Sequence, residues 1–278
     1  MLKKLLGRFR KALGAWLIGE HAVQVPQSPA PTNMNHRVFR DEELDGWMNF
    51  STGELIAGFP ISHEETLLDV GCGDGVFANF CAMQGAKVIL ADTDAARLTN
   101  ASRIVAPNAR NLIAMVTDSN PLPLADGVAT RVMAIEVMEH VDEPLKFLKE
   151  LVRVGSKGAL YFIAVPDARS ENLQRQLAPP VYFEKPNHIH VFDRPEFIKL
   201  IEDAGLTIER EFSYGFYSTL WWVFFWACKQ DLSPPWHPLL DSWRNTWANL
   251  LETQQGPQIK SILDRCLPKS QAVIARKI

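Results

Sequence analysis

The sequence predicts an α/β fold with a doubly wound, seven-stranded sheet, mostly parallel, that ends in a C-terminal antiparallel hairpin and follows an N-terminal helical extension. Three observations favour this fold. Residues 67–78 have the pattern of a buried strand, a glycine turn and the start of a helix. Strand-like and helix-like segments then alternate to about residue 210, and one more strand-like segment stands at 271–277.

Each expected element rests on a local pattern. Short apolar runs suit strands that are covered on both faces, and glycine or proline marks several of the ends. Gly155 and Gly158 close one helix, and Pro166 stops the strand that follows. The expected strands are 67–70, 87–91, 112–116, 130–135, 159–165, 207–212 and 271–277, and the expected helices are 75–84, 94–101, 143–154 and 195–204.

The glycine turn predicts the kind of ligand. Gly71, Gly73 and Gly75 have the spacing Gly-x-Gly-x-Gly, whereas a dinucleotide site has Gly-x-Gly-x-x-Gly and places a pyrophosphate on the helix N-terminus. Asp69 precedes the turn and Asp74 lies inside it, and both carboxylates would repel a phosphate. They suit a ligand without phosphate that carries a cationic ammonium.

A third acidic residue agrees with this interpretation. The expected strand 87–91 leads to Asp92, about twenty residues after the glycines, where the ribose-binding acid of a βαβ unit belongs. An ammonium, a sulfonium and a ribose with two hydroxyls are together the chemistry of S-adenosylmethionine. The alternative is a glycine turn of some other α/β protein.

Residues from about 65 to 210 resemble class I S-adenosylmethionine-dependent methyltransferases. The resemblance implies a Rossmann-like sheet, S-adenosylmethionine as cofactor, and a position for Asp118 near the adenine amino group. For Asp118 alone, an ordinary loop aspartate is the competing interpretation. The residues that carry the resemblance are Asp69, Gly71, Gly73, Gly75, Asp92, and Asp118 followed by Pro121-Leu122-Pro123-Leu124.

Composition limits the class of protein. The chain has 278 residues, 47% of them hydrophobic, which is ample for one α/β domain with additions. Its formal net charge of −3 gives no global attraction for nucleic acid, so a nucleic-acid partner is disfavoured. The four cysteines form no C-x-x-C pair, which fits a reducing, cytoplasmic compartment.

Three parts are expected along the chain. Residues 1–21 form a basic amphipathic helix, residues 22–36 are a proline-containing linker, and residues 37–278 form the methyltransferase domain with an N-terminal lid at 40–59. The basic helix suits peripheral contact of residues 1–20 with an anionic membrane, on its inner face. The alternative is packing on the domain or on a partner in a homo-oligomer.

The domain also carries an aromatic-rich C-terminal insertion. Its apolar run, 216–228, is too short to cross a bilayer, which takes about twenty residues. We favour a buried helix or a subunit interface over a surface that dips into lipid, because aromatic-rich core segments are common.

A cluster of acids and histidine follows the strand at 130–135. Glu136, Glu139 and His140 are three and four residues apart, so a helical turn would bring them to one face at the ligand crevice. Two carboxylates and an imidazole there can hold a divalent cation, Mg²⁺ or Mn²⁺. Further along, His188 and His190 would share one side of an extended segment.

This cluster resembles two branches of the methyltransferases. Metal-dependent small-RNA 2′-O-methyltransferases share its Glu-x-x-Glu-His pattern and a later histidine, which implies Glu136, Glu139, His140 and His190 as ligands. Ubiquinone-biosynthesis O-methyltransferases share the stretch from Met138 to Val141. Without a metal, His140 or His190 would act as a general base or simply line the pocket.

The sequence therefore predicts an S-adenosylmethionine-dependent O-methyltransferase. The first expectation for the acceptor is a vicinal diol on a sugar, a glycan or a lipid-linked intermediate, with metal assistance. A catechol or quinone-type small molecule comes second, and an RNA 3′ end is the least favoured. A degenerate methyltransferase fold that serves as a scaffold is the non-enzymatic alternative.

Overall fold

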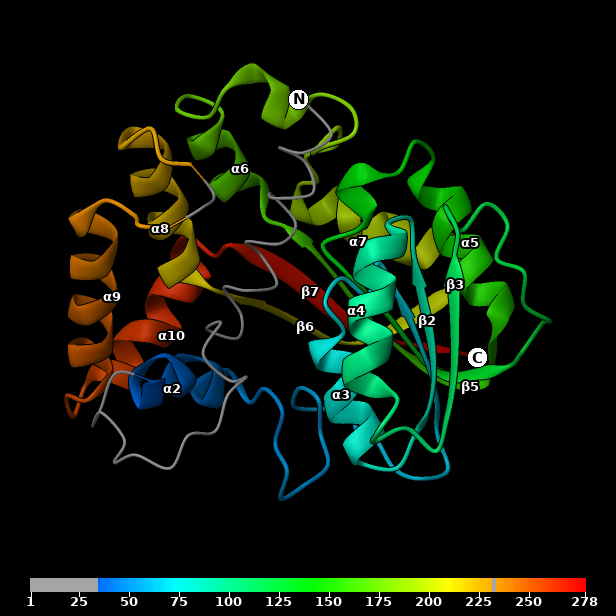
Figure 1. The fold of residues 1–278 in the computed structure, drawn as a ribbon. Coiled ribbons are helices and arrows are strands. Elements are labelled where there is room, and N and C mark those ends of the chain that lie inside the picture. Colours follow the sequence, from blue (N-terminus) through cyan, green and yellow to red (C-terminus); the bar gives the residue numbers. More distant parts are fainter. Residues whose placement is uncertain (1–34, 232–233) are drawn as a thin grey trace.

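The fold is that of a computed structural model, which describes residues 35–231 and 234–278 (Figure 1). Within these residues a seven-stranded sheet has the order β3-β2-β1-β4-β5-β7-β6. The strands are β1 (Thr66–Val70), β2 (Lys87–Asp92), β3 (Asn111–Val116), β4 (Ala129–Ile135), β5 (Gly155–Pro166), β6 (Leu206–Tyr214) and β7 (Ser270–Lys277). The helices are α2 (Asn35–Asp45), α3 (Val76–Met83), α4 (Ala95–Val105), α5 (Pro144–Val154), α6 (Ala168–Gln174), α7 (Arg194–Asp203), α8 (Phe216–Ala227), α9 (Pro238–Leu251) and α10 (Gly256–Cys266), with 3-10 turns η1 (Met138–His140) and η2 (Pro180–Phe183).

The sheet topology confirms the predicted fold class. Strands β1 to β5 pair in parallel, and β7 runs antiparallel to both β5 and β6. The strand order reverses between β1 and β4, because the chain builds outward through β2 and β3 on one side and through β4 and β5 on the other. Ligand crevices of doubly wound folds open at the carboxyl ends of the strands beside such a reversal.

Helices cover both faces of the sheet (Figure 1). Phe80 of α3 and Leu98 of α4 are buried in the core of one face, and Leu148 of α5 and Phe197 of α7 are buried in the core of the other. This two-sided burial explains why the central strands are continuous apolar runs rather than alternating ones.

Some element boundaries differ from those expected. Helix α2 begins at Asn35, inside the segment 22–36 that was expected to be a linker. The expected lid at 40–59 contains the rest of this single helix, followed by turns and two β-bridges from Asn49 to Glu54 and from Glu54 to Pro60. The glycine at 155 both ends α5 and starts β5. The amphipathic helix at 1–21 lies outside the described residues, so membrane contact through residues 1–20 stays a prediction.

The aromatic-rich insertion lies between β6 and β7 and consists of α8, α9 and α10. Trp221 and Phe225 of α8 are buried against α9 residues such as Trp247, which confirms the buried-helix interpretation of 216–228. Among residues 35–231 and 234–278, every helix falls short of the length and hydropathy that a bilayer-spanning segment needs.

A buried cation joins the lid to the insertion. Lys260 of α10 is 2% exposed, and its Nζ lies 2.6 Å from Asp45 Oδ1, 2.6 Å from Asp264 Oδ2 and 3.5 Å from Asp41 Oδ1. Burial and the charges of Asp41 and Asp264 raise the pKa of Asp45 to about 7, although Lys260 opposes that rise. Three carboxylates therefore surround this one cation. The charge of Lys260 stabilises the ionised forms of Asp41 and Asp45, so these α2 residues can pack against α10.

Replacing Lys260 by Met should lower the free energy of unfolding by about 3 kcal/mol, because buried carboxylates then lose their counter-ion. The loss should grow as the pH rises above about 7, since below that pH the carboxyls can take up protons. Denaturant unfolding at several pH values measures this. Lys199→Met is the matched control, because Lys199 pairs with Asp203 at the surface and should cost under about 1 kcal/mol. Equal losses of unfolding free energy in the two variants would contradict a stabilising role for the buried Lys260 charge.

Candidate active site

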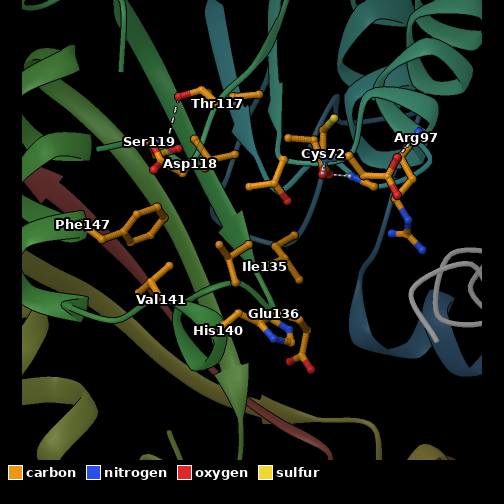
Figure 2. A pocket seen from close by; sticks show the side chains of 18 of the residues that line it. Cys72, Arg97, Thr117, Asp118, Ser119, Ile135, Glu136, His140, Val141 and Phe147 are labelled. Atoms are coloured by element: carbon orange, nitrogen blue, oxygen red, sulfur yellow. Dashed lines mark hydrogen bonds between the residues drawn. The ribbon is translucent and has the colours of Figure 1, made fainter. Parts of the chain in front are cut away.

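A cavity of about 820 Å³ opens at the carboxyl ends of the central strands. The glycine loop after β1 forms one wall, and the ends of β2 and β3 form the next. Figure 2 shows side chains that reach this cavity from separate elements, with Asp118 and Ser119 following β3, and Glu136 and His140 following β4. The turn at 182–188 contributes Tyr182 and residues 186–188. The predicted cofactor residues and the predicted acid and histidine cluster thus share one cavity.

The glycine loop has the backbone that its sequence demands. Gly71, Gly73 and Gly75 have φ values of 69°, 53° and 79°, a region that L side chains rarely adopt. The loop leads directly into α3, and all three glycines line the cavity. Asp69 precedes it on β1 and is 5% exposed. Burial, and then the charge of Asp92, raise the pKa of Asp69 well above the usual carboxyl range. A cationic group bound beside it would favour its ionised form.

Asp92 is held in place by backbone donors. Its Oδ2 accepts a hydrogen bond from Gly73 N at 3.0 Å, and its Oδ1 accepts one from Asp94 N at 2.9 Å. These bonds tie the end of β2 to the glycine loop and fix the carboxylate at the cavity wall. The position is the one from which an acid binds ribose hydroxyls in doubly wound folds.

Asp118 lines the same cavity after β3, the strand next to β2, and is exposed. Its Oδ1 accepts a hydrogen bond from Asn120 N at 3.1 Å, which shapes the loop after β3. The structure therefore puts all six predicted cofactor-binding residues on one cavity, with Asp118 at its solvent edge.

Gly75→Ala should lower the free energy of unfolding by roughly 2–5 kcal/mol, from the left-handed backbone and from crowding together. A Cβ at this position would lie 2.7 Å from Ala101 Cβ and 2.9 Å from Ala101 Cα, on helix α4. Urea unfolding measures the loss. Gly127→Ala is the control, because Gly127 also has positive φ (71°) but its Cβ would meet only Ser156 Cα at 3.7 Å. We expect about 1–2 kcal/mol there; a Gly75 variant as stable as the control would refute the close approach.

Glu136 lies in the cavity, but a distant lysine holds its carboxylate. The residue has φ of 54°, unusual for a non-glycine, at the end of β4. Its Oε2 lies 2.7 Å from Lys269 Nζ, and its Oε1 accepts a hydrogen bond from Ser270 Oγ at 2.8 Å. Burial alone would lower the pKa of Lys269, but the charges of Glu136 and Glu171 and the hydrogen bond to Glu136 together raise that pKa. The structure therefore turns Glu136 toward β7 rather than onto a common helical face with Glu139 and His140.

Glu139 and His140 lie on η1. Glu139 is fully buried, and neither carboxylate oxygen has a hydrogen-bond partner among the described residues. Burial, and then the charge of Glu136, raise its pKa well above the usual carboxyl range. His140 Nδ1 lies 2.9 Å from the carbonyl oxygen of Asn187. A carbonyl only accepts, so Nδ1 carries the proton and the lone pair of the neutral ring sits on Nε2, 3.5 Å from Glu139 Oε1.

His188 joins these two residues. Its Nδ1 lies 2.8 Å from Glu171 Oε2, so Nδ1–H donates to the carboxylate, and in the neutral ring Nε2 carries the lone pair. Burial alone would raise the pKa of Glu171, but His188 and then Lys269 bring it below its usual value. One ligand atom from each of Glu139, His140 and His188 lies within 4.8 Å of the others. An acceptor that orients the far nitrogen of a histidine is typical of metal sites.

His190 takes another place. Its ring stacks on Phe192 with centroids 5.5 Å apart, and its Nε2 is buried without a hydrogen-bond partner among the described residues. The backbone N–H of His190 donates to the carbonyl of Glu139 at 3.2 Å. Of the two histidines in this segment, His188 lines the cavity and groups with Glu139 and His140.

Two buried residues of the site lacked a sequence signal. Glu171 of α6 orients His188, and Lys269 before β7 pairs with Glu136. Neither stands near the Glu136–His140 motif in the chain, and only the tertiary fold brings them to it. A buried lysine and a buried glutamate have no local pattern that separates them from surface residues.

The protein combines a doubly wound sheet, a glycine loop and an acid at the end of β2. These features are typical of the class of doubly wound proteins that bind a nucleoside. Residues 34–211 match the family described as "Methyltransferase domain", and the chain belongs to this family. The match covers the sheet from β1 to most of β6, and the insertion after β6 lies beyond it.

Curated relatives agree on the family and differ in the acceptor. An O-methyltransferase of ubiquinone biosynthesis from Parvibaculum lavamentivorans is 32% identical over 97 residues, 35% of this chain and 38% of that protein. The norajmaline N-methyltransferase of Rauvolfia serpentina is 26% identical over 188 residues, 65% of this chain and 61% of that protein. The chain thus spans less than two thirds of the length of these relatives.

Among solved structures, a putative sarcosine dimethylglycine methyltransferase from Galdieria sulphuraria has a TM-score of 0.59 at 16% identity, covering 97% of this chain and 98% of that one. Similarity at this level shows the shared fold.

Proposed function

We propose that the protein transfers a methyl group from S-adenosylmethionine to an acceptor hydroxyl. One observation carries the proposal. Glu139, His140 and His188 open onto the same cavity as the glycine loop and Asp92, so a reactive centre adjoins a cofactor site. When bound, S-adenosylmethionine supplies a methyl group on a sulfonium, whose sulfur keeps the bonding electrons as the methyl group moves to the acceptor oxygen.

His140 supports proton removal from the acceptor. Its Nδ1–H is held by Asn187, so Nε2 is the basic nitrogen and can take the hydroxyl proton as the new carbon–oxygen bond forms. Glu139 in its ionised form would stabilise the resulting imidazolium. The sequence named His190 as the other candidate base, and its stacking on Phe192 away from the cavity favours His140.

We also propose that this centre holds a divalent cation. His140 Nε2 would then be a metal ligand and not the base, so the proton transfer described above belongs to the centre without a metal. Two imidazole nitrogens and one carboxylate suit Mn²⁺ better than Mg²⁺, which prefers oxygen. The buried oxygens of Glu139, without hydrogen-bond partners among residues 35–231 and 234–278, fit a charged ligand. Such a cation would lower the pKa of a bound hydroxyl and hold a vicinal diol by both oxygens. Glu139, His140 and His188 would hold it, with Glu136 retained by Lys269.

Two chemical classes supply an acceptor with a vicinal diol. A sugar, glycan or lipid-linked diol is the first expectation from the sequence, and a catechol or quinone-type molecule is the second. The name of the Parvibaculum relative favours the second class. A scaffold without catalysis would have no need for the glycine loop and Asp92.

The test uses chelator-treated protein, methyl-labelled S-adenosylmethionine, and either 4-methylcatechol or methyl glucoside, with and without Mn²⁺. Label should appear in one of the two acceptors and rise on addition of Mn²⁺. Transfer that is equal with and without the metal would leave His140 as a metal-free base and overturn the cation proposal. If S-adenosylmethionine binds but no label is transferred to either diol, the proposal that the protein methylates a hydroxyl of a vicinal diol is overturned.

His188→Gln should abolish Mn²⁺ binding, while His190→Gln should leave it unchanged. The reason is that His188 Nε2 belongs to the cluster, whereas the His190 ring stacks on Phe192. Electron paramagnetic resonance of free Mn²⁺ in a titration measures both. The opposite pattern, with His190 required and His188 dispensable, would restore the ligand set that the sequence resemblance implies.

A further inference from the structure

The cavity of about 820 Å³ described above is called the cofactor cavity. A second, smaller cavity of about 100 Å³ adjoins it. Four residues line both of them, namely Val76, Phe77, Ile135 and Glu136. Helix α2 and the turn after it line this cavity, together with α8, α9 and the end of β6. A molecule in the second cavity would therefore reach the first at Glu136.

The walls of the second cavity are aromatic. Trp47 stacks on Phe77, with centroids 4.8 Å apart and planes at 18°, and meets Tyr214 edge-on at 5.4 Å. In the same lining, Tyr217 stacks on Trp247, with centroids 6.3 Å apart and planes at 25°. Such walls complement a flat apolar ring through offset and edge contacts. The aromatic rings themselves offer few hydrogen-bond partners for the several hydroxyls of a sugar. Three of the acids in the lining are already engaged, Asp41 by Trp247, Asp45 by Lys260 and Glu136 by Lys269.

The charges along this cavity select the sign of its occupant. Asp41, Glu42 and Asp45 line it from α2, and Glu136 lines it at the junction, against Lys269 and Arg244. Lys269 is paired with Glu136, and Arg244 lies 3.3 Å from Asp241. Burial, and then the charges of Asp41 and Asp45, raise the pKa of Glu42 to about 8. Above about pH 8, where Glu42 is ionised, an anionic ring would add repulsion here, and a cation would relieve it.

We infer that the second cavity seats the acceptor, and that the acceptor is an uncharged or cationic phenolic ring whose reactive hydroxyl passes Glu136 into the cofactor cavity. The inference rests on the proposed function and narrows its acceptor to the aromatic class. The α8–α10 insertion, which lies outside the family match, then acts as the specificity element because it supplies Tyr217 and Trp247.

The test compares four probes by calorimetric titration into protein saturated with S-adenosylhomocysteine, at a pH above about 8 so that Glu42 is ionised. Three share a catechol ring and differ in charge: 4-methylcatechol, dopamine and 3,4-dihydroxybenzoate. The fourth is methyl glucoside. We expect the neutral and cationic catechols to bind at least about tenfold more tightly than the anionic catechol and the sugar. Binding of 3,4-dihydroxybenzoate or methyl glucoside as tight as that of 4-methylcatechol would overturn the inference.

Variants test whether 4-methylcatechol binds in the second cavity. Trp47→Ala should weaken 4-methylcatechol binding about tenfold and leave cofactor affinity unchanged, because Trp47 lines only the second cavity. Phe50→Ala is the control, three residues further on, 60% exposed and lining neither cavity. Measured above about pH 8, where Glu42 is ionised, Glu42→Gln should reduce the ratio of dopamine affinity to 3,4-dihydroxybenzoate affinity while 4-methylcatechol affinity stays constant.

The two proposals can fail separately. Catechols that bind as expected but are never methylated would overturn the proposed function and leave the acceptor cavity standing. Methylation of catechol that Trp47→Ala and Phe50→Ala leave equally unchanged would overturn the acceptor cavity and keep the proposed function.

Discussion

Asp92→Ala should weaken S-adenosylmethionine binding by about 100-fold or more. In this position a carboxylate accepts hydrogen bonds from both ribose hydroxyls, and bonds to a charged acceptor contribute about 1.5–3 kcal/mol each. The substitution also removes the acceptor of Gly73 N and Asp94 N, so the glycine loop loses its anchor to β2. Isothermal titration of the cofactor measures the change.

The control is Asp118→Ala in the same cavity. Asp118 is exposed at the rim and is engaged by Asn120 N. We expect its loss to cost less than tenfold in affinity, since an exposed hydrogen bond contributes about 1 kcal/mol. Unfolding curves of both variants show whether the loop itself survives. Unchanged affinity in a folded Asp92 variant would remove this residue from the cofactor site.

Glu139→Gln should lower Mn²⁺ affinity and turnover at least about 100-fold while the protein stays folded. The glutamine keeps the shape of the side chain and removes the charge, which burial already opposes. A merely structural carboxyl would leave metal affinity intact, so Mn²⁺ titration separates the two roles. Stability should stay equal or rise, because a buried ionisable group is lost.

Glu143→Gln is the matched control for this substitution. Glu143 lines the same cavity, but it is exposed and lies 3.3 Å from Lys146. Its loss should leave Mn²⁺ affinity and turnover unchanged. If Glu139→Gln binds Mn²⁺ and turns over like the Glu143 variant, the proposed metal centre does not include Glu139.

Much of the fold follows from local sequence. The run from Leu67 to Val70 is buried on both faces of the sheet, so it carries a strong apolar signal. The glycines after it need positive φ, and few other residues tolerate that backbone. Their conformation and the position of Asp92 both agree with the sequence prediction.

The site was less predictable because long-range partners decide it. Glu136 was expected beside Glu139 on a helical turn, but its left-handed backbone turns it to Lys269, 133 residues later. His188 and His190 are equivalent by local alternation. Glu171 on α6 distinguishes them, because it orients His188 toward the cavity.

The position of α2 has a similar origin. Segment 22–36 has a linker composition, but α2 starts at Asn35. Contacts with the far end of the chain hold this helix, since Asp45 pairs with Lys260 and Asp41 accepts a hydrogen bond from Trp247 Nε1 at 2.7 Å. Helix propensity depends on neighbouring residues in the sequence, so it carries no information about these long-range contacts.

The most direct test is a crystal structure of the protein with S-adenosylhomocysteine and 4-methylcatechol. We predict the ribose on Asp92, the ring between Trp47 and Tyr217 in the second cavity, and a hydroxyl directed past Glu136 toward the cofactor sulfur. A ribose without contact to Asp92, or a catechol ring bound outside the second cavity, would contradict this account.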